Sequence, residues 1–274
     1  SFAWSVLNYT EHKNAKAEFD FEAERIHQLI TKRMSSYEGL LMGVKSFFMA
    51  SKEVSLQEWQ IYFDKLQFEN HFPGLQGIGY VQHLSSEENI DELKALLQTY
   101  GMVDYSIKPE GIRDEYFPVV FLTPLDHRNE KAIGFDIYSE GIRRNSIESA
   151  RNREETSITR KITLVQEGDK NIQSGLLMNV PFFTNERIDK QNLPRGLDGI
   201  INAVIRMDDF ITELLEPEIL MNMHLKIYDQ EASEENILFD SHKNSQHKAF
   251  PVRFDHSTTL DIYDQDWIVT LEGQ

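Results

Sequence analysis

The chain has 274 residues, of which 40% are hydrophobic, so it can form one large domain or two ordinary ones with a buried core. Its 45 acidic and 28 basic residues give a formal net charge of −17, which excludes binding modes that need a basic surface, such as recognition of nucleic acid or anionic lipid. Cysteine is absent, which excludes disulfides, thiolate metal sites and cysteine nucleophiles.

The two ends of the sequence indicate a segment of a longer protein. The chain opens on the apolar and aromatic residues SFAWSVLNY and stops within DWIVTLEG, which is typical of a strand. No uninterrupted apolar run reaches the roughly 18 residues that a membrane helix needs. The nearest, GLLMGVKSFFMA, is interrupted by Lys45. The alternative is a complete chain with irregular ends.

Residues 1–54 are predicted to be dominated by one long helix. Between Lys13 and Ala50, apolar residues recur at steps of four and three, which is a heptad-like seam. The seam consists of Phe19, Ala23, Ile26, Ile30, Tyr37, Leu40, Val44 and Phe47, with Arg33 at its one polar position. Such a helix would be longer than about 50 Å, so we expect a stalk that pairs with a second copy as a homodimer. The alternative is a break near Gly39 or Gly43 into two helices that pack on a domain.

Two capping boxes, SLQE at 55–58 and SSEE at 85–88, predict the starts of the next two helices. Between them, FPGLQGIGYVQHL is typical of a turn followed by a strand. Its glycines at 74, 77 and 79 do not match the dinucleotide-binding fingerprint, because the strand follows them. We interpret them as turn and close-packing glycines.

The rest of the chain alternates strands with few helices, which predicts an α+β fold with antiparallel sheets. Expected strands lie at 103–108, 116–122, 161–165, 175–183, 199–207, 224–228, 237–240, 258–262 and 267–271, with helices after Ser139 and at 208–215. The polar segment 185–196 has the composition of a linker. We therefore expect two sheet modules, one at 55–190 and a shorter one at 191–274.

Asp136 is the most informative single residue. It lies between Phe135 and Ile137, where a charge is disfavoured unless it is paired. In an apolar pocket, its carboxylate would recognise a planar N–H or amine donor, since it can accept two hydrogen bonds. The alternative is that it caps the following helix or accepts backbone N–H groups near Ser139. Tyr80, on its own strand, is either a pocket residue or part of the core.

The sequence has no other clear motif for metal binding, catalysis or phosphate binding. The nine histidines lack metal-ligand spacing, and no nucleophile elbow or phosphate loop occurs. We expect no metal, no cofactor and no catalysis. Arg143, Arg144, Arg151 and Arg153 alternate with glutamates, which predicts a solvated face with helix-spaced ion pairs.

Several consecutive motifs together resemble the CHASE domain, the extracytoplasmic ligand sensor of plant cytokinin receptors and of many bacterial signalling proteins. They are FPGLQGIGYVQHL, YFPVVFLTPLDHRNEKAIGFDIYSEGIRRNSIESARNREETSITRKITLVQE and GLLMNVPFF, in that order. The resemblance covers roughly residues 55–274 and is best between 72 and 183.

The resemblance implies a long N-terminal helix followed by two tandem PAS-like modules, of which the first, membrane-distal one binds the ligand. It implies that the segment is periplasmic, in an inner-membrane receptor whose cytoplasmic output is a histidine kinase, a diguanylate cyclase or phosphodiesterase, or an adenylyl cyclase. Asp136, in GFDIYS, aligns with the acidic residue that binds the adenine ring in the plant receptors. Pocket walls are implied at Tyr116, Val119, Phe121, Ile158, Met178 and Asn179. Cytokinin itself is not implied, because the bacterial relatives match better.

Three hypotheses of function follow. The first is a dimeric sensor that binds a small nitrogenous or adenine-like molecule. The second is a carboxylate-based hydrolase, for which chance acidic pairs such as Asp208-Asp209 give no support. The third is a structural or protein-partner ectodomain whose pocket is filled by bulky side chains such as Phe121, Phe135 and Met178. The size of any cavity beside Asp136 discriminates between the first and the third.

Overall fold

The computed structural model describes residues 2–167, 172–243 and 252–273, which divide into two compact units. Residues 36–210 form one, here the five-stranded unit, and residues 1–35 and 211–274 form the other, the four-stranded unit. The helices are α1 (Phe2–Met49), α2 (Leu56–Leu66), α3 (Phe68–His71), α4 (Glu88–Thr99), α5 (Gly141–Arg153), α6 (Met207–Leu214) and α7 (Pro217–Asn222). The strands are β1 (Leu75–Gln82), β2 (Val119–Thr123), β3 (Ser157–Ile158), β4 (Gly175–Phe183), β5 (Leu197–Arg206), β6 (Met223–Asp229), β7 (Ile237–Asp240), β8 (Phe254–Ile262) and β9 (Gln265–Gly273).

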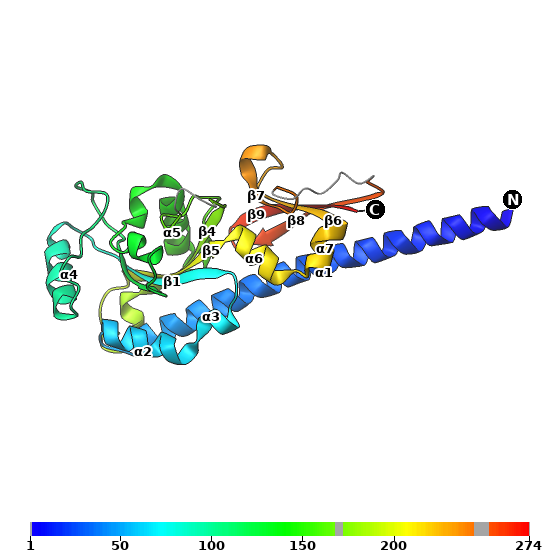
Figure 1. The fold of residues 1–274 in the computed structure, drawn as a ribbon. Coiled ribbons are helices and arrows are strands. Elements are labelled where there is room, and N and C mark those ends of the chain that lie inside the picture. The colour runs from blue at the N-terminus through cyan, green and yellow to red at the C-terminus, as the bar shows by residue number, and fades with distance from the viewer. Residues whose placement is uncertain (1, 168–171, 244–251, 274) are drawn as a thin grey trace. The chain divides into compact units, whose positions relative to one another are not determined.

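The five-stranded unit is an antiparallel sheet in the order β2-β1-β5-β4-β3. Its middle strand, β5, pairs with β1 on one edge and with β4 on the other, and nearly all its residues are buried. Such a strand needs neighbours on both edges and cover on both faces. Helix α5 covers one face, and α2, α3 and the C-terminal part of α1 lie on the other (Figure 1).

This topology differs from the predicted module boundary after residue 190. Strand β5 was assigned to the second module by that boundary, yet it is the central strand of the first sheet. The polar residues 185–196 connect β4 to β5, two neighbours in the same sheet. A polar loop between adjacent antiparallel strands and an interdomain linker have the same composition, so only the strand pairing distinguishes them.

Helix α1 confirms the predicted long helix, without a break at Gly39 or Gly43. The apolar residues of the seam are buried within the units, except Phe47, which is partly buried while its neighbour Phe48 is buried. In the five-stranded unit the Phe48 ring lies 4.5 Å from Tyr80, and in the four-stranded unit Phe19 lies 5.7 Å from Phe254. The heptad-like spacing therefore covers the chain's own sheets, and a stalk dimer through this seam would have to displace that packing.

The four-stranded unit has an antiparallel sheet in the order β7-β6-β9-β8. On β9, Trp267, Val269 and Leu271 are buried and alternate with more exposed residues, as expected for a sheet with one covered face. Two antiparallel sheets with helices confirm the predicted α+β class.

Local signals had mixed outcomes. The Ser55–Glu58 capping box is formed in full. The second is not, because the hydroxyls of Ser85 and Ser86 donate to Asn89 Oδ1, 3.1 Å away in each case. The expected strands at 103–108 and 161–165 contribute only isolated bridges, Lys108 to Phe135 and Ile162 to Gly175, because their backbones meet a partner at one position each.

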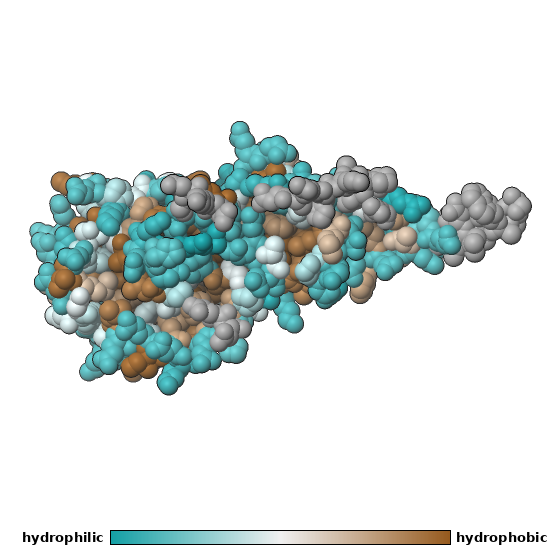
Figure 2. Space-filling view, viewed as in Figure 1, coloured by the Kyte–Doolittle hydropathy of each residue, from teal (hydrophilic) through white to brown (hydrophobic). Residues whose placement is uncertain are grey.

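The glycines of β1 are close-packing residues, as predicted. A Cβ at Gly79 would lie 2.4 Å from Asn202 Oδ1, and one at Gly77 would lie 3.0 Å from the carbonyl oxygen of Thr123. Gly74 has φ +89° and lies against the backbone of Phe210, which fits the predicted turn. Over the five-stranded unit, the visible surface mixes hydrophilic residues with separate apolar ones, an ordinary pattern for a surface in water (Figure 2).

A buried histidine in the four-stranded unit predicts a pH-dependent stability. The ring of His27 lies 5.4 Å from His256, and its Nδ1 lies 3.9 Å from Glu24. Burial, and then His256, lower the pKa of His27 below its ordinary value, and Glu24 opposes the shift. The unfolded chain therefore takes up the proton first, so stability falls as the pH drops through about 6.5.

We expect the melting temperature, followed by circular dichroism, to fall between about pH 7 and about pH 5. The fall should be smaller in His27→Gln, which cannot be protonated. His127→Gln is the control, because His127 is exposed and should leave the fall as in the wild type. Equal falls in all three proteins would contradict this assignment.

Candidate functional site

The predicted pocket residues separate onto the two faces of the five-stranded sheet. Asn179 faces α5, where its Nδ2 donates to Ser146 Oγ over 2.9 Å, and Val119 belongs to the core on that side. Tyr80 and Phe121 are paired across β1 and β2 and face α1, and Ile158 and Met178, paired across β3 and β4, lie on this second face too. Since successive strand residues point to opposite faces, they cannot all line one cavity.

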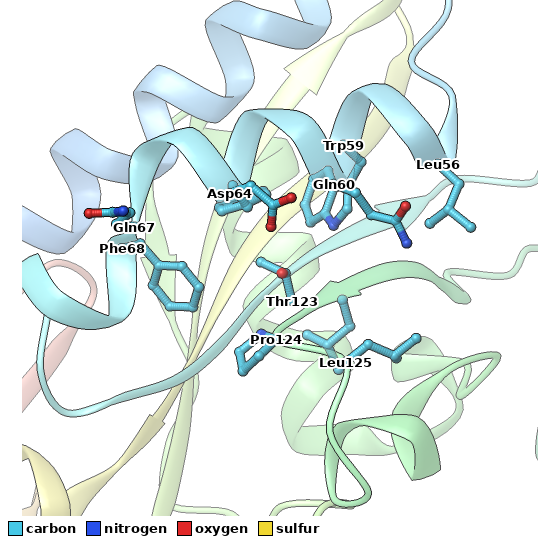
Figure 3. Close-up of a pocket in the computed structure, with 11 residues that line it drawn as sticks. Leu56, Trp59, Gln60, Asp64, Gln67, Phe68, Thr123, Pro124 and Leu125 are labelled. Atoms are coloured by element: carbon cyan, nitrogen blue, oxygen red, sulfur yellow. The ribbon is translucent and has the colours of Figure 1, made fainter.

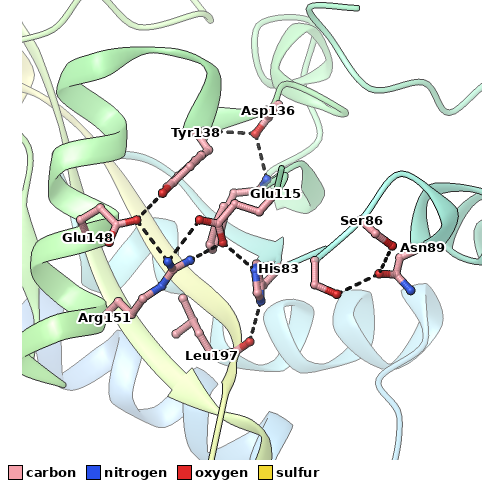
Figure 4. A network of polar contacts seen from close by, with 11 residues as sticks. His83, Ser86, Asn89, Glu115, Asp136, Tyr138, Glu148, Arg151 and Leu197 are labelled. Carbon is pink, nitrogen blue, oxygen red and sulfur yellow. Dashed lines mark hydrogen bonds and ion pairs between the residues drawn. The ribbon is translucent and has the colours of Figure 1, made fainter. Parts of the chain in front are cut away.

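Asp136 is fully buried and makes the contacts of the alternative left open in the sequence analysis, those of a helix cap. It is the N-cap of the short 3-10 helix Ile137–Ser139, and its Oδ1 accepts the N–H groups of Phe117 at 2.8 Å and Tyr138 at 3.1 Å (Figure 4). Its Oδ2 lies 3.2 Å from Arg113 Nη1, an ion pair that does not meet hydrogen-bond geometry. The partners of this charge are thus backbone amides and one arginine of the same chain.

Burial is the strongest influence on this carboxyl group and raises the pKa of Asp136 above its ordinary value. The two backbone hydrogen bonds and the positive charges of Arg113 and Arg144 act in the opposite direction. A ligand that donates to Asp136 would have to replace Arg113 at Oδ2. Whether a ligand does so stays a prediction.

The α5 side of the sheet is filled by side chains. Its cavity has a volume of only about 20 Å³ and is lined by Val119, Phe135, Ile137, Leu177 and Asn202, among others. That volume holds about one water molecule. Asn202 is buried there, and its Oδ1 has no hydrogen-bond partner among the described residues. The space between α5 and the sheet, next to Phe135 and Ile137, is therefore far smaller than a ligand pocket.

A larger cavity of about 300 Å³ lies on the opposite face, over β1 and β2, and is called here the β1–α4 cleft. Its walls come from α4, from the end of α1 with residues 52–54, and from the segment 187–198. Tyr80 and Phe121, two of the predicted pocket residues, line it. Its volume is at the lower limit of small-molecule sites.

Arg187 is the buried charge of this cleft. Its Nη1 donates to Asp198 Oδ2 over 3.1 Å, and its Nη2 donates to the carbonyl oxygen of Lys52. Its Nε has no hydrogen-bond partner among the described residues. Lys190 Nζ lies 3.7 Å from Asp198 Oδ1, so Asp198 balances two positive charges. A guanidinium fixed at one end with a free N–H at the other suits an anionic or carbonyl group.

Tyr80 adds a neutral donor. Burial raises the pKa of Tyr80 above its ordinary value, so the hydroxyl stays protonated. The hydroxyl makes no hydrogen bond to any residue in the described part of the chain. Arg187 and Tyr80 thus add polar groups to a cleft whose wall also contains the aromatic rings of Phe48 and Phe121.

Two further hollows are more open. One, of about 500 Å³, lies between α2 and residues 122–125, and the indole nitrogen of Trp59 points toward Thr123 there (Figure 3). The other, of about 570 Å³, contains Tyr116 and Arg113, and the Tyr116 hydroxyl accepts the N–H of Arg113 over 2.9 Å. Tyr116 is thus linked to Asp136 through Arg113 but lies away from the other predicted residues.

The arginines of α5 are less solvated than predicted. Arg143 is buried and donates to the carbonyl oxygen of Thr163 over 2.7 Å. Arg151 donates to Glu115 over 2.6 Å, and His83 contacts the same carboxylate at 2.8 Å (Figure 4). The predicted helix-spaced ion pairs also form, from Arg143 to Glu140 at 3.1 Å and from Arg151 to Glu148 at 3.2 Å. The contacts with Thr163 and Glu115 join residues 20 or more positions apart, so helix spacing alone could not reveal them.

Sequence reasoning missed Arg187 and Arg113. Arg187 lies in the polar segment that was interpreted as a linker, and a single arginine in such a segment carries no local signal.

Among the described residues, no group of three metal-ligating side chains comes together. No helix in the described residues is both long and apolar enough to cross a membrane.

We expect Asp136→Ala to lower the free energy of unfolding by about 3 kcal/mol, because it leaves the buried Phe117 N–H unpaired and removes the partner of Arg113. Asp136→Asn should cost less, since an amide oxygen can still accept that N–H. Chemical denaturation measures both. Asp104→Ala, at an exposed aspartate, is the control and should change stability by no more than about 0.5 kcal/mol. An unchanged free energy of unfolding in Asp136→Ala would refute the cap role.

Solved structures share the fold. The ligand-binding domain of the Pseudomonas aeruginosa amino acid chemoreceptor PctC, in complex with GABA, is 11% identical, with a TM-score of 0.53 over 95% of this chain and 100% of that one. The periplasmic sensory domain of the Campylobacter jejuni chemoreceptor Tlp1 is 13% identical, with a TM-score of 0.50 over 95% and 92%. An extracellular ligand-binding receptor from Desulfohalobium retbaense is 10% identical, with a TM-score of 0.52 over 92% of this chain but 39% of that one.

At these identities the likeness establishes the fold alone. A comparison with curated proteins finds no match. The CHASE domain family matches residues 52–239, which is more than half of the chain and includes Asp136 and all residues of the β1–α4 cleft except Phe48. The resemblance seen in the sequence motifs is thereby confirmed, and the chain belongs to the CHASE domain family.

Proposed function

We propose that this chain is the extracytoplasmic sensor domain of a transmembrane receptor and that it binds a small molecule in the β1–α4 cleft of the five-stranded unit. Membership of the CHASE family and a fold shared with sensory domains of chemoreceptors support the general role. The observation that carries the site is a cavity of about 300 Å³ with buried Arg187 and Tyr80 at its walls.

The cleft is placed well for relaying a signal within its unit. It contains Phe48, near the C-terminal end of α1, together with side chains of α4 and β1. A ligand that fits one arrangement of these elements better than another would shift the population toward it, whereas equal affinity would transmit nothing. In the proposed receptor, the output is a cytoplasmic histidine kinase or cyclic-di-GMP enzyme.

Dimerisation is also part of the proposal, through a different part of α1 from the predicted seam. The seam is occupied by the chain's own side chains, so a partner helix would use the opposite, solvent-facing side. Phe21 and Met42 are exposed on α1, at 68% and 44% of their surface. Exposed apolar residues on a long helix are candidates for such a contact.

The predicted ligand contact of Asp136 takes a modified form in this proposal. Asp136 would act by holding Phe117 and Arg113 in place, while Tyr80 and Phe121 would touch the ligand. Direct contacts of Val119, Ile158, Met178 and Asn179 with a ligand remain predictions.

A second candidate function is a structural or protein-partner ectodomain. The volume of about 20 Å³ on the α5 side favours it, because the core between α5 and the sheet is filled. The two candidates differ in whether the β1–α4 cleft binds a small molecule: the sensor requires such binding, and the partner-binding ectodomain does not.

Blocking the cleft should abolish ligand-induced stabilisation. Leu96, on α4, lines the cleft and is 37% exposed, so Leu96→Trp can fill the space without overpacking the core. We expect small-molecule hits from a thermal-shift library to raise the melting temperature of the wild type but not of Leu96→Trp, since binding to the native state alone is what stabilises it.

Ile61→Trp is the matched control, because Ile61 on α2 is exposed and lies outside the cleft. It should keep the shifts of the wild type. Hits that stabilise Leu96→Trp as strongly as the wild type would remove the cleft as the site. A library without any hit would favour the partner-binding ectodomain.

A further inference from the structure

The polar groups of the β1–α4 cleft are unevenly divided between donors and acceptors. Three donors lack an acceptor among the described residues: Arg187 Nε, the Tyr80 hydroxyl and Lys52 Nζ. Arg187 and Tyr80 are each 7% exposed and both line the cavity. An unsatisfied buried donor is costly, so a group that satisfies it binds with advantage.

The two carboxylates of the cleft already have partners, and the Gln82 amide offers a donor as well as an acceptor. Asp198 accepts from Arg187 and pairs with Lys190, and Glu53 accepts the hydroxyl hydrogen of Tyr100. A ligand that brings donors would compete with these contacts, while a ligand that brings acceptors would complete the set. The cleft therefore selects for hydrogen-bond acceptors.

The remaining wall is apolar and aromatic. The Tyr80 ring lies 4.5 Å from Phe48 and 5.9 Å from Phe121, and Leu93 and Leu97 are buried beside them. Such a surface takes a short hydrocarbon or a flat ring.

We infer that the β1–α4 cleft binds a small organic carboxylate, with its anionic group toward Arg187, Tyr80 and Lys52 and its apolar body against Phe48 and Phe121. This inference rests on the proposed sensor function and narrows it to a class of ligand. A carboxylate is the acceptor that matches a guanidinium best. The net charge of −17 repels anions at long range, so selection occurs through these short contacts.

This class is opposite to the donor ligand expected from Asp136 in the sequence. That expectation assumed a carboxylate in need of a partner, and Asp136 already has Phe117, Tyr138 and Arg113. In the β1–α4 cleft, on the other face of the sheet, the unpaired groups named above are donors.

The test uses isothermal titration calorimetry with monocarboxylates from acetate to phenylacetate, each matched with its primary amide and its amine analogue. We expect carboxylates to bind at least about tenfold more tightly than their amides, since hydrogen bonds to a charged group exceed those to a neutral one. Tyr80→Phe should weaken carboxylate binding by about tenfold, and Lys52→Gln by about threefold, because Lys52 is exposed.

Both variants avoid the structural contacts of Arg187, and their melting temperatures verify folding. Lys65→Gln, at an exposed lysine on α2 outside the cleft, removes the same charge and should bind as the wild type.

Tighter binding of amides or amines, lost in Leu96→Trp, would overturn the carboxylate class and keep the sensor cleft. Carboxylate binding that is unchanged in Tyr80→Phe and Leu96→Trp would place the anion elsewhere and overturn the inference. A complete absence of binding by the panel would overturn it as well, while the wider library decides the sensor function.

Discussion

The burial of β5 on both faces and along both edges is the constraint on which the rest of the five-stranded unit depends. Because β1 and β4 pair with it on either side, the sheet has an apolar surface toward α5 and another toward α1. Each surface must be covered, and each cover can leave a cavity. The α5 side closes almost completely, whereas the α1 side leaves the β1–α4 cleft. The question of where a ligand binds is therefore a question of which face is less well filled.

Electrostatics follow from the same burial. Asp136 and Arg187 are both charges removed from water, and both are held by main-chain groups and one opposite charge. They differ in what is left over. Asp136 caps a short helix through Oδ1 and forms an ion pair with Arg113 through Oδ2, while Arg187 keeps one N–H without an acceptor. A buried ion pair supports the fold, and an unused donor beside it can also recognise a ligand.

Helix α1 illustrates the limit of periodicity. Apolar residues at steps of three and four indicate that one side of a helix is covered, without saying by what. Here the cover is the chain's own sheets, since Phe19 packs on Phe254 in one unit and Phe48 on Tyr80 in the other. A dimer of the proposed receptor is compatible with this only if it uses the other side of the helix.

By itself, the sequence determined the local elements and the family. The spacing of apolar residues predicted α1, the Ser55–Glu58 box predicted the start of α2, alternation predicted β9, and consecutive motifs identified the CHASE family. These signals depend on residues a few positions apart, which is the range over which helix and strand geometry repeats. The tertiary structure decided what depends on distant partners. It places β5 in the first sheet and Tyr80 and Asn179 on opposite faces of that sheet. It also brings Arg113 into an ion pair with Asp136, and Arg187, from a polar loop, to the wall of a cavity. Strand order and cavity volume are set by packing between segments far apart in the chain, so no local pattern carries them.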